Sequence, residues 1–158
     1  MRIIVAPDSY KGSLSAKRAA EIMARAVTDV FAAIPIEMPV ADGGEGTLEA
    51  ILAGGKGRYL EAEVTSPLGK RIPAQWGMLE DGTAVIEMAQ ASGLTLAPGK
   101  DPMRASSHGT GELMAAALAA GGKRGLMGTG GHAPNARGQG LPPPLGGGFP
   151  GGPGKPPP

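Results

Sequence analysis

The first element of the chain begins with Arg2-Ile-Ile-Val-Ala6, a short β-branched run that ends at Pro7-Asp8. A run of this kind is typical of a buried strand in a parallel sheet. A helical pattern follows, and Ser15 is its expected N-cap. The apolar residues of this pattern share one helical face: Ala16, Ala19, Ala20, Met23, Ala26, Val27, Val30 and Phe31. The opening therefore predicts a strand followed by an amphipathic helix.

The same order of elements then repeats. Ile36-Glu-Met-Pro-Val40 predicts a second strand, in which Pro39 favours a sheet edge or a strand end. A second helix is expected from about Gly46 to Ala53, before Gly54-Gly55. This β-α-β-α order predicts an α/β domain with a parallel sheet, of the Rossmann-like or flavodoxin-like class.

From Tyr59 the pattern becomes that of an antiparallel meander. Three strands are expected, at Tyr59–Thr65, Ile72–Leu79 and Thr83–Glu87, with turn signals between them. A helix over about Gly109–Ala120 and a strand over 124–128 complete the pattern. We therefore expect residues 1–65 to form the first part of the α/β domain. Residues 66–131 are expected to begin a second, inserted subdomain with a mixed or antiparallel sheet.

Composition excludes several classes of function. The chain has 158 residues, with 15 Lys and Arg against 14 Asp and Glu, so a net charge of +1 gives no electrostatic case for nucleic acid or an anionic membrane. Cysteine is absent, which removes disulfides, thiol nucleophiles and Cys-ligated metals. The longest apolar run, Leu113–Ala120, is far shorter than the ~20 residues of a membrane-spanning helix. A soluble, cytoplasmic protein is expected.

The C-terminal segment differs from the rest. Between His132 and Pro158, 17 of 27 positions are Gly or Pro, and no Asp or Glu occurs after Glu112. Ordering 27 residues costs roughly 30–50 kcal/mol of backbone entropy, at about 1–2 kcal/mol each. Since so few large apolar residues are present to offset that cost, we expect residues 132–158 to be disordered.

The first turn, after the first strand, carries candidate functional residues. Asp8 suits Mg²⁺, which prefers oxygen ligands, or the acceptance of a hydroxyl proton, although Asp is also common as a turn former or helix cap. Lys11 suits an anionic substrate group, its alternative being a solvated surface lysine. The other candidates of this turn are Ser9, Gly12 and Ser13, small residues that let a ligand approach the backbone.

The second turn delivers another acid to the same edge of the predicted sheet. It reads Asp42-Gly-Gly-Glu-Gly-Thr47, and Gly43, Gly44 and Gly46 exceed what a helix cap needs. Asp42 has the same alternatives as the first acid, Mg²⁺ ligand or base, and Glu45 and Thr47 complete the candidates. Glu87, at the end of a later strand, is either a third acid of the site or a rim carboxylate.

Two nucleotide-binding patterns are weak or absent. Gly128-x-Gly130-x-x-Ala133 matches a dinucleotide fingerprint only loosely, because the helix it requires cannot continue through Pro142-Pro-Pro144. No GxxxxGK[ST] pattern occurs, which disfavours a P-loop enzyme. His108 and His132 are isolated histidines without metal-ligand spacing.

Several long motifs, in order, resemble bacterial glycerate kinases of the GarK/GlxK type. The matching stretches are Ile4–Ala16, Met38–Thr47, Thr65–Gly69, Ala84–Leu94 and Ser106–Leu113. The resemblance covers about residues 1–131 and implies the N-terminal portion of a two-domain α/β enzyme. Such an enzyme uses ATP and Mg²⁺ to phosphorylate D-glycerate to 2-phosphoglycerate or 3-phosphoglycerate, the former being the expected product.

The resemblance assigns the first two turns to the active-site cleft. From residue 132 onward, the sequence departs from the pattern of the family. Asp8, Lys11 and Asp42 are then the expected catalytic residues, with Asp8 and Asp42 as the metal ligands. Where the family carries a hydroxyl and an acid, this chain has His132 and Ala136, so Asn135 alone of this third turn is kept as a binding candidate. The alternative is a non-catalytic α/β binding module with a Pro/Gly-rich interaction tail.

Overall fold

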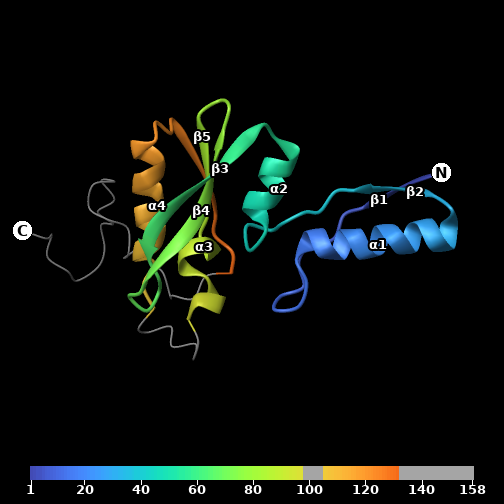
Figure 1. The fold of residues 1–158 in the computed structure, drawn as a ribbon, viewed down its shortest axis with the longest axis horizontal. Coiled ribbons are helices and arrows are strands. Elements are labelled where there is room, and N and C mark those ends of the chain that lie inside the picture. Colours follow the sequence, from blue (N-terminus) through green and yellow to red (C-terminus); the bar gives the residue numbers. More distant parts are fainter. Residues whose placement is uncertain (98–104, 132–158) are drawn as a thin grey trace, which may run out of the picture.

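The computed structural model describes residues 1–97 and 105–131, and its strands and longer helices follow one another in the predicted order (Figure 1). The elements are β1 (Arg2–Val5), α1 (Ala16–Phe31), β2 (Ile34–Glu37), α2 (Thr47–Gly54), β3 (Gly57–Thr65), β4 (Arg71–Leu79), β5 (Thr83–Glu87), α3 (Ala89–Ser92), a 3₁₀ turn (Leu94–Leu96), α4 (His108–Ala119) and β6 (Arg124–Gly128). The fold is mixed α/β, as expected. The strands form one parallel and one mixed sheet.

The N-terminal unit consists of β1, α1 and β2. The two strands pair in parallel, with Arg2 opposite Ile34 and Val5 opposite Glu37. Helix α1 begins where Ser15 predicts, because the Ser15 hydroxyl accepts a hydrogen bond from the Arg18 N–H at 3.2 Å. The unit is therefore a β-α-β crossover that brings the carboxyl ends of both strands to one edge.

Three features of this unit differ from what the sequence predicts. β1 is not a buried strand: only Val5 is buried, and Ile4 is 63% exposed, because within the described residues the sheet has two strands and α1 covers one of its faces. The C-terminal half of the apolar face of α1 is likewise exposed, with Val30 at 72% and Phe31 at 60%. The second strand covers Ile34–Glu37 rather than 36–40, so Pro39 lies beyond its end.

The second sheet has the strand order β3-β4-β5-β6. β3 pairs antiparallel with β4 over nine positions, and β5 pairs antiparallel with β4, which confirms the predicted meander. β6 then lies parallel to β5, with Val85 opposite Leu126, so the sheet is mixed. β3 falls within the range 1–65 and β4 within 66–131, so this sheet takes strands from both predicted parts, and the domain division stays a prediction.

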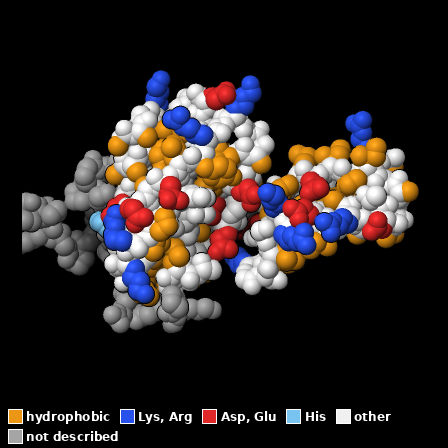
Figure 2. All heavy atoms as spheres, viewed as in Figure 1, with side chains coloured by type: hydrophobic (Ala, Val, Ile, Leu, Met, Phe, Trp, Pro, Cys, Tyr) orange, Lys and Arg blue, Asp and Glu red, His pale blue; other side chains and the backbone are white. Residues whose placement is uncertain are grey.

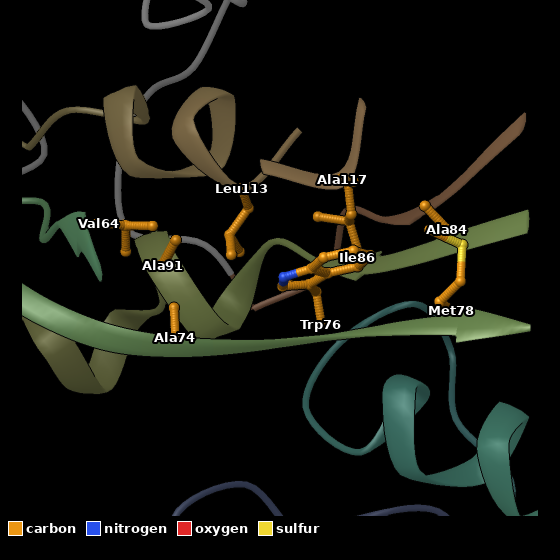
Figure 3. Packing of buried hydrophobic residues seen from close by; sticks show 9 residues of the cluster. All are labelled: Val64, Ala74, Trp76, Met78, Ala84, Ile86, Ala91, Leu113 and Ala117. Atoms are coloured by element: carbon orange, nitrogen blue, oxygen red, sulfur yellow. The ribbon is translucent and has the colours of Figure 1, made fainter. Parts of the chain in front are cut away.

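The main core fills the space between this sheet and α4 (Figure 3). Trp76 of β4 lies under α4, near Leu113 and Ala117, and all three are at most 3% exposed. The other buried members are Val64, Ala74, Met78, Ala84, Ile86 and Ala91. Side chains of a strand alternate between faces, so Ala84 and Ile86 of β5 pack toward α4.

Helix α2 covers the opposite face of the same sheet (Figure 1). Val85, between the two β5 residues that face α4, packs against Leu48 and Leu52 of α2. Residues 84–87 are thus buried, because both faces of the sheet are covered at β5. This packing anchors α2, and with it the second turn, to the centre of the sheet.

The structure adds three findings to this picture. The short α3 and the 3₁₀ turn lie where no element was predicted. In the described part of the chain, no helix has the length and apolar character needed to cross a membrane. The Pro/Gly-rich segment 132–158, with Asn135 and His132, lies outside the described residues.

The packing of α4 against β3 leads to a stability prediction. A Cβ at Gly109 would overlap the carbonyl oxygen of Thr65, whereas Gly54, at the end of α2, has open space around it. We expect Gly109→Ala to lower the free energy of unfolding by about 1–3 kcal/mol, the usual cost of overpacking. Gly54→Ala is the matched control, expected to be neutral or slightly stabilising. Urea denaturation measures both, and equal midpoints would contradict the close approach.

Candidate functional site

Two turns leave the parallel sheet at the same edge. The pairing of β1 with β2 continues beyond the strands, because Met38 N–H donates to the Val5 carbonyl at 2.9 Å and Val40 N–H donates to the Pro7 carbonyl at 3.1 Å. Asp8 follows Pro7 directly, and Asp42 lies two residues after Val40. Both acids therefore enter their turns from neighbouring positions of one sheet edge.

The first turn, residues 7–14, is a small closed loop. Tyr10 and Leu14 exchange backbone hydrogen bonds of 2.8 and 3.1 Å, and Gly12 closes the loop with a φ of +73°, a conformation that favours glycine. Asp8 is half-buried, and its Oδ1 accepts a hydrogen bond from the Ser9 N–H at 2.6 Å. Lys11 is exposed at the tip of the loop.

The second turn, residues 41–46, packs on the end of β6. Asp42 is exposed, and its Oδ1 accepts a hydrogen bond from the Gly44 N–H at 3.1 Å. Gly43 has a φ of +98°, and its carbonyl accepts a hydrogen bond from the Gly130 N–H at 2.8 Å. A Cβ at Gly130 would lie 2.7 Å from the Gly44 nitrogen, so this contact requires glycine.

A cleft of about 540 Å³ lies between the two turns and the four-stranded sheet. Its lining contains five of the predicted site residues: Ser9, Gly12, Ser13, Glu45 and Gly46. Elements far apart in the sequence thus meet at one hollow. Figure 2 shows acidic and basic side chains gathered where the N-terminal unit meets the rest of the molecule.

The remaining predicted residues lie beside this cleft and do not line it. Asp8 lines an adjacent hollow that shares Ser9 and Tyr10 with the cleft. Lys11 lies between two lining residues of the first turn. The others are Asp42, Gly43, Gly44 and Thr47, which belong to the second turn and the start of α2. Thr47 is buried, and its hydroxyl has no hydrogen-bond partner among the described residues.

Six further lining residues with polar side chains were not among the predicted site residues: Tyr10, Ser15, Glu49, Tyr59, Gln75 and Gln90. The lining also includes Glu87, which the sequence offers either as a third acid of the site or as a rim carboxylate. Gln90 lies in the stretch Ala84–Leu94, so a search of that motif for polar residues is the signal that would find it. Tyr59 and Gln75 come from β3 and β4, and only the pairing of those strands with the sheet brings them to the cleft. Burial raises the pKa of Tyr59, with a smaller contribution from Glu49.

The described lining is acidic. It includes Glu45, Glu49 and Glu87, and among the described residues that line the cleft none is Lys or Arg. Lys17 of α1 forms an ion pair with Glu49 of α2 at 3.3 Å, and both side chains are well exposed. An anionic ligand in this cleft therefore needs a cation from outside the lining. Lys11 is a candidate, because its two neighbours in the sequence both line the cleft.

Glu87 is the most buried of these acids. It is 1% exposed, and its Oε2 accepts a hydrogen bond from the Leu48 N–H at 2.9 Å, while Oε1 lies 3.4 Å from the Gln90 amide nitrogen. Burial raises the pKa of Glu87, and the hydrogen bond from Leu48 opposes that rise only in part. The final residue of β5 therefore carries a carboxyl group that is held away from water at the floor of the cleft.

A metal held entirely by protein side chains does not fit the described residues. In residues 1–97 and 105–131, no group of three or more His, Cys, Asp or Glu side chains is arranged to hold a metal ion. Mg²⁺ usually keeps several waters and takes one or two carboxylates together with substrate phosphates. Asp8 and Asp42, each with one oxygen engaged by a neighbouring N–H, have the chemistry for that kind of site.

Comparison with known families gives a match over almost the whole chain. The model of the "Glycerate kinase family" matches residues 3–157. The chain is 50% identical over 151 residues to the glycerate kinase of Bacillus subtilis, covering 93% of this chain and 40% of the relative. It is 48% identical over 145 residues to the glycerate 2-kinase of Escherichia coli, covering 89% of this chain and 38% of the relative.

A solved structure agrees with these matches. A crystal structure from Salmonella typhimurium LT2, of a protein assigned as glycerate kinase 2, superposes with a TM-score of 0.67 and 45% sequence identity. The match covers 89% of this chain and 39% of the solved one. This chain thus spans about 40% of the length of the curated relatives that it matches.

The burial of Glu87 predicts a pH dependence of stability. Because folding raises the pKa of Glu87, the folded state holds the proton more tightly than the unfolded state. The contribution of Glu87 to stability is therefore greatest below the ordinary glutamate pKa and is lost as the pH rises through the raised value. Glu87→Gln keeps an acceptor for the Leu48 N–H and cannot ionise. We expect this variant to match or exceed the parent chain in unfolding free energy at pH 7.

Urea denaturation between pH 4 and pH 8 provides the measurement. The stability advantage of Glu87→Gln should shrink as the pH falls. A variant whose stability deficit grows as the pH rises would show that the ionised carboxylate stabilises the fold, contrary to this account.

Proposed function

Because the chain belongs to the glycerate kinase family, we propose that it carries the N-terminal turns of an ATP-dependent glycerate kinase. The reaction transfers the γ-phosphoryl group of ATP to a hydroxyl group of D-glycerate, and 2-phosphoglycerate is the product we favour over 3-phosphoglycerate. The observation that supports this most directly is the meeting of two glycine-rich, acid-bearing turns at one polar cleft. The enzyme is a phosphotransferase with an alcohol group as acceptor.

The cleft has features that phosphoryl transfer requires. The reaction depends mainly on positioning and on neutralising charge, rather than on covalent chemistry by the protein. Lys11 neutralises the carboxylate of the sugar acid or a phosphate. Asp8 and Asp42 supply the carboxylates, one of which accepts the hydroxyl proton as the new P–O bond forms and the bond from phosphorus to the ADP oxygen breaks.

The glycines of the second turn support the nucleotide part of the proposal. Gly43, Gly44 and Gly46 present backbone without side chains, so that phosphate oxygens can approach N–H groups closely. Ser9, Gly12 and Ser13 play the same part on the facing turn, and Glu45 and Thr47 frame the second turn. Asn135 of the third turn remains a binding candidate by family resemblance alone.

Mg²⁺ is the expected cofactor beside ATP, and Asp8 and Asp42 would hold it. When bound, the ion would offset the negative charge that the phosphates bring to an acidic cleft. The described lining has no Lys or Arg for that purpose. We further propose that the protein works in the cytoplasm on small molecules, without a nucleic-acid or membrane partner.

Substitutions in the two turns provide the test. Residues 1–131 can be fused to the remaining C-terminal part of the Bacillus subtilis relative, so that the assayed enzyme has the length of its relatives. In this fusion and in the chain itself, ATP-dependent phosphorylation of D-glycerate is measured. We expect Asp42→Asn and Lys11→Ala each to lower kcat of the fusion by about 10²–10³-fold, the usual effect of losing one charge-stabilising group, without loss of folding.

Two exposed residues far from the cleft serve as matched controls. Asp29→Asn on α1 and Lys70→Ala, in the turn between β3 and β4, remove the same charges and should leave kcat within twofold of the parent fusion, since isolated surface charges contribute little. Rates near the parent value in both turn variants would refute the assignment of these residues. An inactive parent fusion would count against the proposed function itself.

A further inference from the structure

Helix α2 lacks a cap of its own. Its N-cap residue is Gly46, with a φ of +91°, and no side chain of the turn bonds to the first N–H groups of the helix. Such groups need acceptors when they are buried. Glu87, 39 positions further along the chain, provides the acceptor, because its Oε2 lies 2.9 Å from the Leu48 nitrogen. The end of β5 therefore caps the helix that follows the second turn.

This cap is an ionisable carboxyl group, although a neutral amide would satisfy the same bond. Glu87 is 1% exposed, and burial is the main cause that raises its pKa. Glu45 of the second turn raises the pKa of Glu87 further. Glu49 of α2 and Tyr59 of β3 line the same cleft, and Tyr59 interacts with both Glu49 and Glu87. Lys17 of α1 pairs with Glu49 rather than with Glu87. An amide at this position would avoid the cost of burying a charge.

The carboxyl group of Glu87 borders the cleft. Glu87, Gln90, Gly46 and Glu45 all line it, so the carboxylate touches the wall formed by the second turn and the helix start. The Gly46 and Leu48 N–H groups both favour the charged form of Glu87. When it is ionised, a carboxylate holds such N–H groups more strongly than an amide does, because charge-assisted hydrogen bonds are about twice as strong as neutral ones.

We propose that Glu87 is a positioning residue, whose buried carboxylate fixes the Gly46–Leu48 start of α2 and thereby holds the second-turn wall of the cleft in its ligand-binding shape. The glycine turn has little stiffness of its own, since two of its residues adopt positive φ angles. The carboxylate provides the stiffness. The identity of the ligand, D-glycerate or ATP, rests on the proposed function. The role of Glu87 in holding the turn does not depend on it.

Hydrogen exchange in the ligand-free chain tests the positioning directly. We expect the Leu48 amide to exchange roughly tenfold faster or more in Glu87→Ala than in the parent chain, as for the loss of a charge-assisted bond. Glu87→Gln should restore part of the protection. Amides of α4 provide the reference for global opening. The matched control is Ser92→Ala, which removes the buried 2.8 Å hydrogen bond between the Ser92 and Thr110 hydroxyls and leaves the turn unchanged.

Kinetics of the fusion enzyme distinguish positioning from simple stability. Glu87→Ala should raise KM for D-glycerate or ATP by about tenfold, Glu87→Gln should have an intermediate KM, and Ser92→Ala should keep the parent KM. The Glu87→Gln enzyme should also lose any acidic limb of the pH profile that belongs to this carboxyl group.

The two arms separate the inference from the proposed function. Unchanged Leu48 exchange in both Glu87 variants would overturn the inference whatever the activity. If Glu87→Ala does not fold, the hydrogen exchange of the Leu48 amide in Glu87→Gln tests the inference instead. We expect that variant to be at least as stable as the parent chain at pH 7. If the parent fusion is inactive but the Leu48 amide exchanges as expected, the proposed function is refuted and the positioning role of Glu87 stands. A KM unchanged in both Glu87 variants of an active fusion would overturn the inference.

Discussion

The hydrogen bond between the Glu87 carboxyl group and the Leu48 N–H ties the start of α2 to the end of β5, and with it one wall of the cleft. β5 lies inside the mixed sheet, with α4 on one face and α2 on the other. The carboxylate at the end of β5 fixes the start of α2, and the start of α2 fixes the second turn. The contact of Gly43 with Gly130 supports the same turn from the end of β6. One wall of the cleft is thus a consequence of how the sheet is packed.

The other wall comes from the N-terminal unit, whose polar link to the sheet region through Lys17 and Glu49 is exposed at both ends. An exposed ion pair of this kind contributes at most about 1 kcal/mol. The wall formed by the second turn is therefore anchored to the core of the four-stranded sheet. The wall formed by the first turn belongs to a two-stranded sheet with one uncovered face in the described part of the chain. The described lining between them is acidic and holds no Lys or Arg, so an anionic ligand bound there would need a cation from outside the lining.

The sequence predicts the order of elements because its patterns are local. The β-branched run at the start, the Ser15 cap and the alternating strands from Tyr59 onward each depend on near neighbours. Burial of the first strand was predicted wrongly, since burial depends on how many strands and helices cover it. The short α3 was missed because four residues give no helical periodicity. The C-terminal segment and Asn135 lie outside the described residues, so their predictions are untested.

The candidate site could be predicted in part for the same reason. Turns that follow parallel strands can be found along the sequence, and they include Ser9, Gly12 and Glu45. Glu87 can be named from its place at a strand end, but its contact with the Leu48 N–H spans 39 positions and has no local pattern. Tyr59 and Gln75 required the strand register. Contacts made only by tertiary packing leave no pattern in a single sequence.

Amide chemical shifts of the ligand-free chain, followed by NMR as Mg–ATP and D-glycerate are added, test the central claim most directly. The account predicts that the largest changes fall on both walls of the cleft, at residues 9–13 and 45–48, with little change in α4. Saturating changes confined to other surfaces, or to one wall alone, would contradict the claim that the two turns form a single site.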